Sequence, residues 1–302
     1  MASLITQVKS KLFINSSQKS MHMLDGAYAS LLHGRSLDFE DLRQYEYGDQ
    51  VRDIDWRATA RMGEPLVKRH RANRMHTVLF VVDTGISMTA LAHDEKPKKD
   101  LAILATGALG ILALRHGDDF SVVHGDASRI RRRAPGRSEG ALEHALRTLD
   151  HAITTTSAPS DRDALLSFVA RTVAKRCIVV VVTDDAPVTE ETERMLRRLR
   201  VQHDVLWITL RDADPVLPSV NGPVHGLRRR RGDVATHWAI PDFVHGDTEV
   251  IDEIAARSRA EGARRDDLLD RLEISRTALD TQDDAVGELL HMLNRRANVR
   301  NR

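Results

Sequence analysis

The segment VLFVVDTGIS, residues 78–87, joins a strongly apolar stretch to a polar loop. Five consecutive apolar residues precede Asp83, and the hydroxyl residues Thr84 and Ser87 follow on either side of Gly85. Strands that are apolar throughout are typical of a parallel sheet with helices on both faces. In such sheets ligands bind beyond the carboxyl ends of the strands. The segment therefore predicts both a fold class and the edge at which a site would lie.

The rest of the chain repeats this pattern of buried strand and helix. Apolar strands are predicted at TVLFVVD (77–83), IVVVV (178–182) and DVLWITL (204–210), and helices between them over 100–115, 138–152, 161–175 and 189–202. This alternation indicates a doubly wound α/β fold with a mostly parallel sheet. We expect three parts: an N-terminal helix with a strand and loop segment over 1–75, the α/β domain over 76–245, and a C-terminal helical segment over 246–302.

Composition excludes several classes of protein. The 45 Lys and Arg against 44 Asp and Glu leave a formal charge of +1, so no overall field attracts nucleic acid or anionic membrane. Cys177 is the one cysteine, and no His-Glu-x-x-His, Cys-x-x-Cys, nucleotide-binding P-loop or hydrolase Gly-x-Ser-x-Gly motif occurs. The apolar run 101–114 is shorter than the roughly 20 residues of a spanning helix. With no signal peptide pattern at the N-terminus, we expect a cytoplasmic protein without enzymatic activity.

A second strand end carries polar residues like those after Asp83. Thr183, Asp184 and Asp185 close the strand at 178–182, so two loops with oxygen ligands would meet above the sheet. Carboxylate and hydroxyl oxygens suit Mg²⁺, and the candidate metal ligands are Asp83, Ser87 and Asp184. The alternative is that Asp83 and Ser87 only cap the turn before the next helix.

The segment around Asp83 resembles the first metal-ion-dependent adhesion motif of von Willebrand factor A domains, Asp-x-Ser-x-Ser. Asp83 and Ser87 match this motif, and Gly85 stands in place of its first serine. The resemblance implies a middle-loop threonine, which would be among Thr154, Thr155 and Thr156 with Thr155 as the first candidate, and a final aspartate, which corresponds to Asp184. Since one hydroxyl is lost, the expected cofactor is weakly bound Mg²⁺ or none. A Gly85→Ser variant is expected to bind the ion more tightly.

Upstream, GRSLDFEDLRQYEYGDQVRDIDWRATAR (34–61) is similar to the hallmark segment of the domain-of-unknown-function 58 (DUF58) family. Twelve residues fit this pattern at fixed spacing: Phe39, Leu42, Arg43, Tyr45, Gly48, Asp49, Arg52, Ile54, Asp55, Trp56, Ala60 and Arg61. Seven of them, Arg43, Tyr45, Asp49, Arg52, Asp55, Trp56 and Arg61, are predicted to form either a partner-docking surface or a charged hairpin that seals the sheet. We expect Trp56 to be buried, so that Trp56→Ala would cost about 3 to 5 kcal/mol.

The family resemblance implies a function as well. Its members are commonly associated with MoxR-type AAA+ ATPases, which implies a protein-interaction module that presents a client to such an ATPase. An alternative is a nucleic-acid-binding protein that uses the Arg runs at 129–133 and 228–231, although both are short, lack aromatic residues and are predicted to be solvated surface. A third is a hydrolase with a Mg²⁺-activated water at Asp83 and Asp184, for which no general base is evident.

Overall fold

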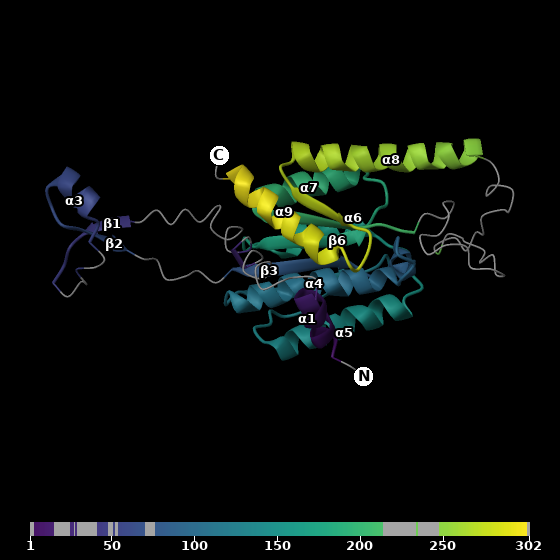
Figure 1. The fold of residues 1–302 in the computed structure, drawn as a ribbon, viewed down its shortest axis with the longest axis horizontal. Coiled ribbons are helices and arrows are strands. Elements are labelled where there is room, and N and C mark those ends of the chain that lie inside the picture. The colour runs from purple at the N-terminus through teal and green to yellow at the C-terminus, as the bar shows by residue number, and fades with distance from the viewer. Residues whose placement is uncertain are drawn as a thin grey trace.

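A six-stranded sheet forms the centre of the protein (Figure 1). The computed structural model describes residues 3–14, 25, 26, 28, 41–47, 51, 54–69, 76–213, 234 and 248–300. The strands are β3 (Thr77–Asp83), β4 (Asp119–Gly125), β5 (Ile130–Arg132), β6 (Ile178–Asp184), β7 (Asp204–Leu210) and β8 (Ser275–Leu279), in the order β5-β4-β3-β6-β7-β8. Only the pairing of β5 with β4 is antiparallel among these strands. The predicted doubly wound, mostly parallel α/β fold is confirmed.

Helices cover both faces of the sheet. One face packs against α1 (Leu4–Ile14), α4 (Lys98–Arg115), α5 (Glu139–Thr155) and α9 (Ala285–Arg300). The other packs against α6 (Arg162–Thr172), α7 (Glu190–Gln202) and α8 (Thr248–Arg271). The side chains of β3 alternate between the two cores, with Phe80 in the first and Val81 in the second. Residues 78–82 of β3 are therefore all apolar, as a strand buried on both faces requires.

Helix α4 is apolar on all sides because other elements surround it. It packs against β3 and β4 of the sheet and against α1, α5 and α9. A Cβ atom at Gly107 would lie 2.8 Å from the Val8 side chain of α1, and one at Gly110 would lie 2.7 Å from Leu142 of α5. The two glycines thus let the neighbouring helices α1 and α5 approach α4 closely. No helix in the described part of the chain is long and apolar enough to cross a membrane.

The N-terminal helix α1 is held by a carboxylate of α5. Glu143 accepts hydrogen bonds from the backbone N–H groups of Leu4 and Ile5, at 3.1 and 2.8 Å, and from the Ser3 hydroxyl at 2.9 Å. Burial alone would raise the pKa of Glu143, but the hydrogen bonds from Ile5, Arg147, Ser3 and Leu4 outweigh it and lower the pKa to about 2. These bonds satisfy donors that the first turn of a helix leaves free.

Replacing Glu143 with glutamine is expected to lower the free energy of unfolding by about 2 kcal/mol at pH 7. The carboxylate is favoured in the folded state, so its contribution is complete above the unfolded pKa near 4.5 and is lost as the pH falls toward 2. Urea denaturation of both proteins from pH 7 to pH 3 would show the two curves converging as the pH falls. A difference that does not change with pH would contradict this role.

The C-terminal part differs from the predicted helical segment. Between α8 and α9 the chain forms β8, which pairs in parallel with β7 and completes the sheet. The strand sequence SRTAL contains two residues with apolar side chains, so it gave no apolar run to recognise. Its buried side chains, Thr277 and Leu279, face α9 and the first core. Residues 275–300 therefore belong to the α/β domain itself.

The hallmark segment forms a small unit of its own, residues 41–69. Strands β1 (Asp41–Gln44) and β2 (Leu66–Arg69) pair antiparallel, and α3 (Trp56–Met62) lies between them in sequence. Asp55 caps α3 by accepting from the backbone N–H groups of Arg57 and Ala58 at 2.9 and 3.0 Å. Asp49 and Arg52 lie outside the described residues, and Arg43 is described only by its place in β1.

The prediction that Trp56 is buried is wrong. Trp56 is 64% exposed at the first position of α3. The large apolar side chains described as buried in this unit are Leu66 and Val67. A two-stranded sheet and one short helix enclose too little volume for a further large ring, so the predicted stability loss for Trp56→Ala does not follow.

Candidate functional site

The candidate site lies at the carboxyl edge of the sheet, where β3 ends at Asp83. The Asp83 side chain is 1% exposed. Its Oδ1 accepts from the Gly85 backbone N–H at 2.8 Å, and its Oδ2 has no hydrogen-bond partner among the described residues. Burial raises the pKa of this carboxyl group to about 7, helped by the negative charge of Asp184 and opposed by Gly85, Ser160 and Lys98. A buried carboxylate with a free oxygen is a strong acceptor for a cation or a donor.

Asp184 ends the neighbouring strand β6, as the sequence predicted. Val82 and Val182 are partners in the parallel pairing of β3 with β6, so the two aspartates follow at the same edge. Asp184 is buried, and its Oδ1 accepts from the backbone N–H of Ala186 at 3.3 Å. The structure therefore brings Asp83 and Asp184 together.

Two serine hydroxyls complete this site. Ser87 lies in the short 3-10 helix η2 (Ile86–Thr89), and its Oγ is 2.5 Å from the Oγ of Ser160 in the loop before α6. The loops are also joined through their backbones, since the N–H of Ile86 donates to the carbonyl of Ala158 at 2.9 Å. We call Asp83, Ser87, Ser160 and Asp184 the loop site.

Thr155 is not in the loop site. Its hydroxyl donates to the carbonyl of His151 at 2.8 Å, within the last turn of α5, and its side chain is exposed. The sequence did not point to Ser160. This residue lies five positions after Thr155, in the loop that joins α5 to α6. A signal was present, because Ser160 directly precedes the Asp161 cap of α6 and so sits at the start of a helix.

Gly85 is glycine because Ser160 occupies the space beside it. A Cβ atom at position 85 would lie 2.4 Å from Cα, 2.5 Å from N and 2.5 Å from Oγ of Ser160. Ser160, on another loop, thus places its hydroxyl where a serine at position 85 would have its side chain. The expectation that Gly85→Ser would restore a ligand does not fit this geometry, since the new side chain would overlap backbone atoms.

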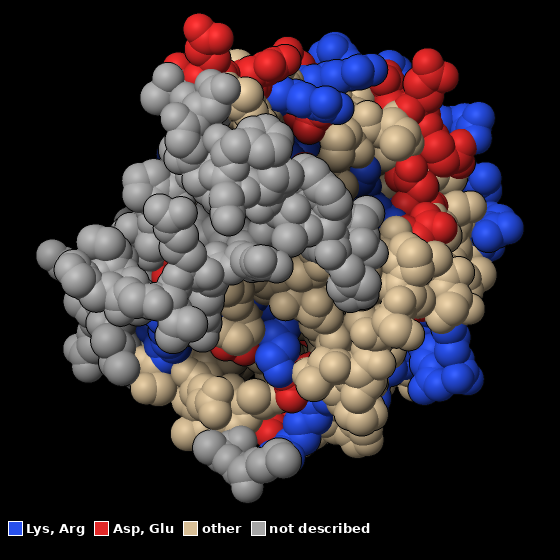
Figure 2. Space-filling model, turned by 90° about the vertical axis from the view of Figure 1, so that its right-hand side faces the viewer, with Lys and Arg blue, Asp and Glu red and all other residues tan. Residues whose placement is uncertain are grey.

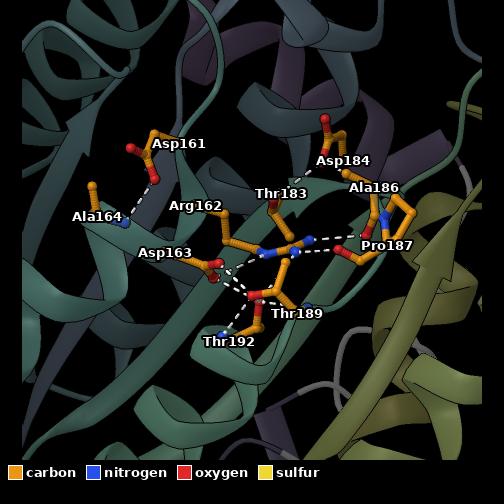
Figure 3. A network of polar contacts seen from close by, with 10 residues as sticks. All are labelled: Asp161, Arg162, Asp163, Ala164, Thr183, Asp184, Ala186, Pro187, Thr189 and Thr192. Carbon is orange, nitrogen blue, oxygen red and sulfur yellow. Dashed lines mark hydrogen bonds and ion pairs between the residues drawn. The ribbon is translucent and has the colours of Figure 1, made fainter.

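A buried arginine holds the loop that follows Asp184 (Figure 3). Arg162, at the start of α6, donates to the backbone carbonyls of Ala186 and Pro187 at 3.0 and 2.7 Å. Its guanidinium carbon also lies 5.6 Å from the ring centroid of Trp207 on β7. These contacts tie the Asp184 loop to α6, the same helix whose preceding loop carries Ser160.

The neighbouring Asp163 fixes the far end of the same loop. It accepts hydrogen bonds from the hydroxyls of Thr189 and Thr192 at 2.7 and 2.6 Å. Thr189 and Thr192 also form a capping box at the start of α7. Together with Arg162, these contacts hold both ends of the connection between Asp184 and α7.

Charged residues that the sequence did not single out surround the loop site. Lys98, the first residue of α4, is fully buried and forms an ion pair with Asp212 after β7. Asp185 follows Asp184 and is also close enough for the Lys98 charge to act on it. Figure 2 looks onto this end of the molecule, where acidic and basic side chains lie together in a recess among uncharged residues. We call Asp83, Asp184, Asp185 and Asp212 the carboxylate cluster.

The donor set suits a hard cation only weakly. The free Oδ2 of Asp83, the carboxylate of Asp184 and the hydroxyls of Ser87 and Ser160 are the oxygen types that Mg²⁺ takes. However, the described residues contain no group of three or more His, Cys, Asp or Glu placed to hold a metal ion. An ion here would depend on hydroxyls and on its own waters.

The first of the two Arg runs, residues 129–133, makes contacts within the chain. In the first run, Arg132 donates to the carbonyl of Thr172 at 3.3 Å, and Arg133 donates to the hydroxyl of Thr148 at 2.7 Å. The second run, residues 228–231, lies outside the described residues. The arginines seen in the first run are therefore partly used for contacts within the chain.

The fold and the loop site define a doubly wound α/β protein with a polar cluster at the carboxyl edge of its sheet. The chain belongs to the DUF58 family, because the family model "Protein of unknown function DUF58" matches residues 41–226. That range includes both the hallmark unit and the loop site.

The chain is also similar to two mycobacterial proteins and to solved structures from other bacteria. The chain is 29% identical over 257 residues to "Uncharacterized protein Rv1480" of Mycobacterium tuberculosis and to "Uncharacterized protein Mb1516" of Mycobacterium bovis, covering 82% of this chain and 76% of each relative. Among solved structures, an aerotolerance-related membrane protein from Bacteroides fragilis is similar with a TM-score of 0.42 at 14% identity, covering 73% of this chain and 99% of the other. A von Willebrand factor type A structure from Catenulispora acidiphila gives 0.37 at 11% identity, with coverage of 74% and 43%.

Proposed function

We propose that this protein is a protein-interaction module without chemistry of its own, acting in the cytoplasm as the adaptor of a MoxR-type AAA+ ATPase. The observation that carries this proposal is the surface of the hallmark unit. Six large apolar side chains are exposed there, which is unusual for so short a segment: Leu42, Tyr45, Tyr47, Val51, Trp56 and Met62. Exposed aromatic and methionine side chains are the anchors of protein interfaces.

The DUF58 membership supports the identity of the partner, since proteins that resemble this family are commonly associated with MoxR-type ATPases. Arg57 and Arg61 are exposed on α3, the helix that Trp56 begins. Interface hot spots are enriched in tryptophan and arginine. The hallmark unit would therefore contact the ATPase, and the loop site would remain available for a client.

Trp56→Ala is expected to weaken binding to a purified MoxR-type AAA+ ATPase at least about tenfold. Truncating an aromatic residue at an interface hot spot typically costs about 2 kcal/mol or more of binding free energy. Its stability should stay within about 0.5 kcal/mol of the wild type, as for other exposed positions. Isothermal titration of the ATPase into both proteins measures the first effect, and urea denaturation the second.

Val201→Ala provides the control, since Val201 on α7 is another exposed apolar residue, 80% exposed against 64% for Trp56. This variant should bind the ATPase as the wild type does. Equal affinities for all three proteins would remove the hallmark unit from the interface. No binding by the wild type would overturn the proposed partner.

We also propose that the loop site binds Mg²⁺ weakly, with a dissociation constant on the order of the millimolar values of the weakest oxygen-ligand sites. The ion would be held by Asp83, Ser87, Ser160 and Asp184, and an acidic group of the client could complete its coordination. Asp83→Ala is expected to abolish the heat of Mg²⁺ or Mn²⁺ binding. Identical, negligible heats in wild type and variant would mean that Asp83 acts only through its bond to Gly85.

A further inference from the structure

Lys98 is a lysine with no contact to solvent. It is 0% exposed although it begins an 18-residue helix, where a lysine would normally extend into water. The backbone N–H of Lys98 donates to the carbonyl of Ala90 at 2.9 Å, so the helix start is fixed against the loop that follows η2. Its ammonium is paired with Asp212, which leaves β7 at the carboxyl edge of the sheet.

The Lys98 ammonium lies near the loop site as well as next to Asp212. Burial raises the pKa of Asp212 to about 6, and Lys98 opposes that rise. Asp212 follows Leu210 of β7, which is the strand partner of Asp184 in β6. The ion pair therefore places the Lys98 ammonium at the edge of the sheet where Asp83 and Asp184 end their strands.

In the described part of the chain, the cations that contact the carboxylate cluster are fewer than its four carboxylates. Asp185 has a second cation nearby, since the Arg265 guanidinium donates to its backbone carbonyl at 3.2 Å and its charge reaches the carboxylate. Asp83 has none of comparable closeness, and its buried Oδ2 is without a hydrogen-bond partner in the described part of the chain. The loop site is therefore a place where a second cation would be stabilised, but beside an ammonium that repels it.

We propose that Lys98 is a built-in cation that competes with divalent metal ions at the loop site and so keeps the metal affinity of this surface low. The proposal rests on the proposed weak Mg²⁺ site and explains its weakness by charge rather than by a missing serine.

The test is Mg²⁺ and Mn²⁺ titration into Lys98→Met, which keeps the length of the side chain and removes its charge. We expect the dissociation constant to fall by about tenfold or more relative to the wild type, as removal of a unit charge at close range implies. Thermal unfolding should show the same trend, with added Mg²⁺ raising the melting temperature of Lys98→Met more than that of the wild type.

Two further variants make the result specific. Lys99→Met removes the next lysine of α4, whose ammonium pairs with Asp150 of α5 at 2.7 Å away from the cluster, and should leave metal affinity unchanged. Lys98→Gln also removes the charge but keeps a hydrogen-bond donor for Asp212, and it should likewise bind Mg²⁺ more tightly than the wild type. It replaces Lys98→Met if that variant does not fold.

The proposal would be overturned if the wild type and the Lys98 variant that folds had equal metal affinity. It would also be overturned if removal of the Lys98 charge lowered the metal affinity. Tighter binding in both Lys98→Met and Lys99→Met would show only a general effect of net charge and would overturn it too. Binding of the AAA+ ATPase to wild type and Lys98→Met, measured separately, distinguishes this outcome from failure of the proposed function.

Discussion

Gly85→Ser is expected to destabilise the protein by about 3 kcal/mol and to leave it with no tighter Mg²⁺ binding. The added Cβ would meet the backbone of Ser160 at 2.4 Å, and backbone atoms cannot move aside as the end of a flexible side chain can. The loop carrying Ser160 would have to shift, which would also break the contact between Ser160 and Ser87. Urea denaturation and Mg²⁺ titration of the variant measure the two effects.

Gly140→Ala is the control for this substitution. Gly140 lies in the first turn of α5, and nothing lies within 4 Å of a Cβ atom built there. Alanine should be neutral or should stabilise the helix by up to about 1 kcal/mol. If Gly85→Ser were as stable as the wild type and bound Mg²⁺ more tightly, the motif resemblance would be a better guide to this site than the packing of Ser160.

Arg162→Met is expected to lower the free energy of unfolding by about 3 kcal/mol, because it removes two charge-assisted hydrogen bonds to the carbonyls of Ala186 and Pro187. The stacking of the guanidinium on Trp207 is lost as well. The effect should be largest in the loop after Asp184, so the amide groups of residues 186–192 should exchange with solvent faster than in the wild type.

Arg171→Met, on the same helix but exposed, should change stability by less than about 0.5 kcal/mol. Hydrogen exchange followed by mass spectrometry, together with urea denaturation, compares the three proteins. Unchanged protection of residues 186–192 in Arg162→Met would show that the loop holds its shape through Thr189 and Thr192 alone. In that case Arg162 would contribute to the core but not to the position of Asp184.

The sequence by itself determined the architecture of the α/β domain and half of the candidate site. Uninterrupted apolar strands such as 78–82 and 178–182 have few alternatives to a sheet covered on both faces. Since parallel strands end at one edge, Asp83 and Asp184 had to lie near one another wherever their strands were neighbours. Ser87 follows Asp83 within one turn and needed no tertiary information.

Only the tertiary structure decided what surrounds those two carboxylates. Ser160, Lys98 and Asp212 reach the site from other loops or helix ends. The contact of Ser160 with Ser87 joins residues 73 positions apart, and the contact of Lys98 with Asp212 joins residues 114 positions apart. Such distances leave no periodic pattern, because the identity of each residue depends on a neighbour that is remote along the chain. The same holds for Trp56, where local sequence indicated a buried ring but the small size of the 41–69 unit leaves it exposed. Local chemistry sets which strands and helices form, whereas the space between them decides which polar groups meet.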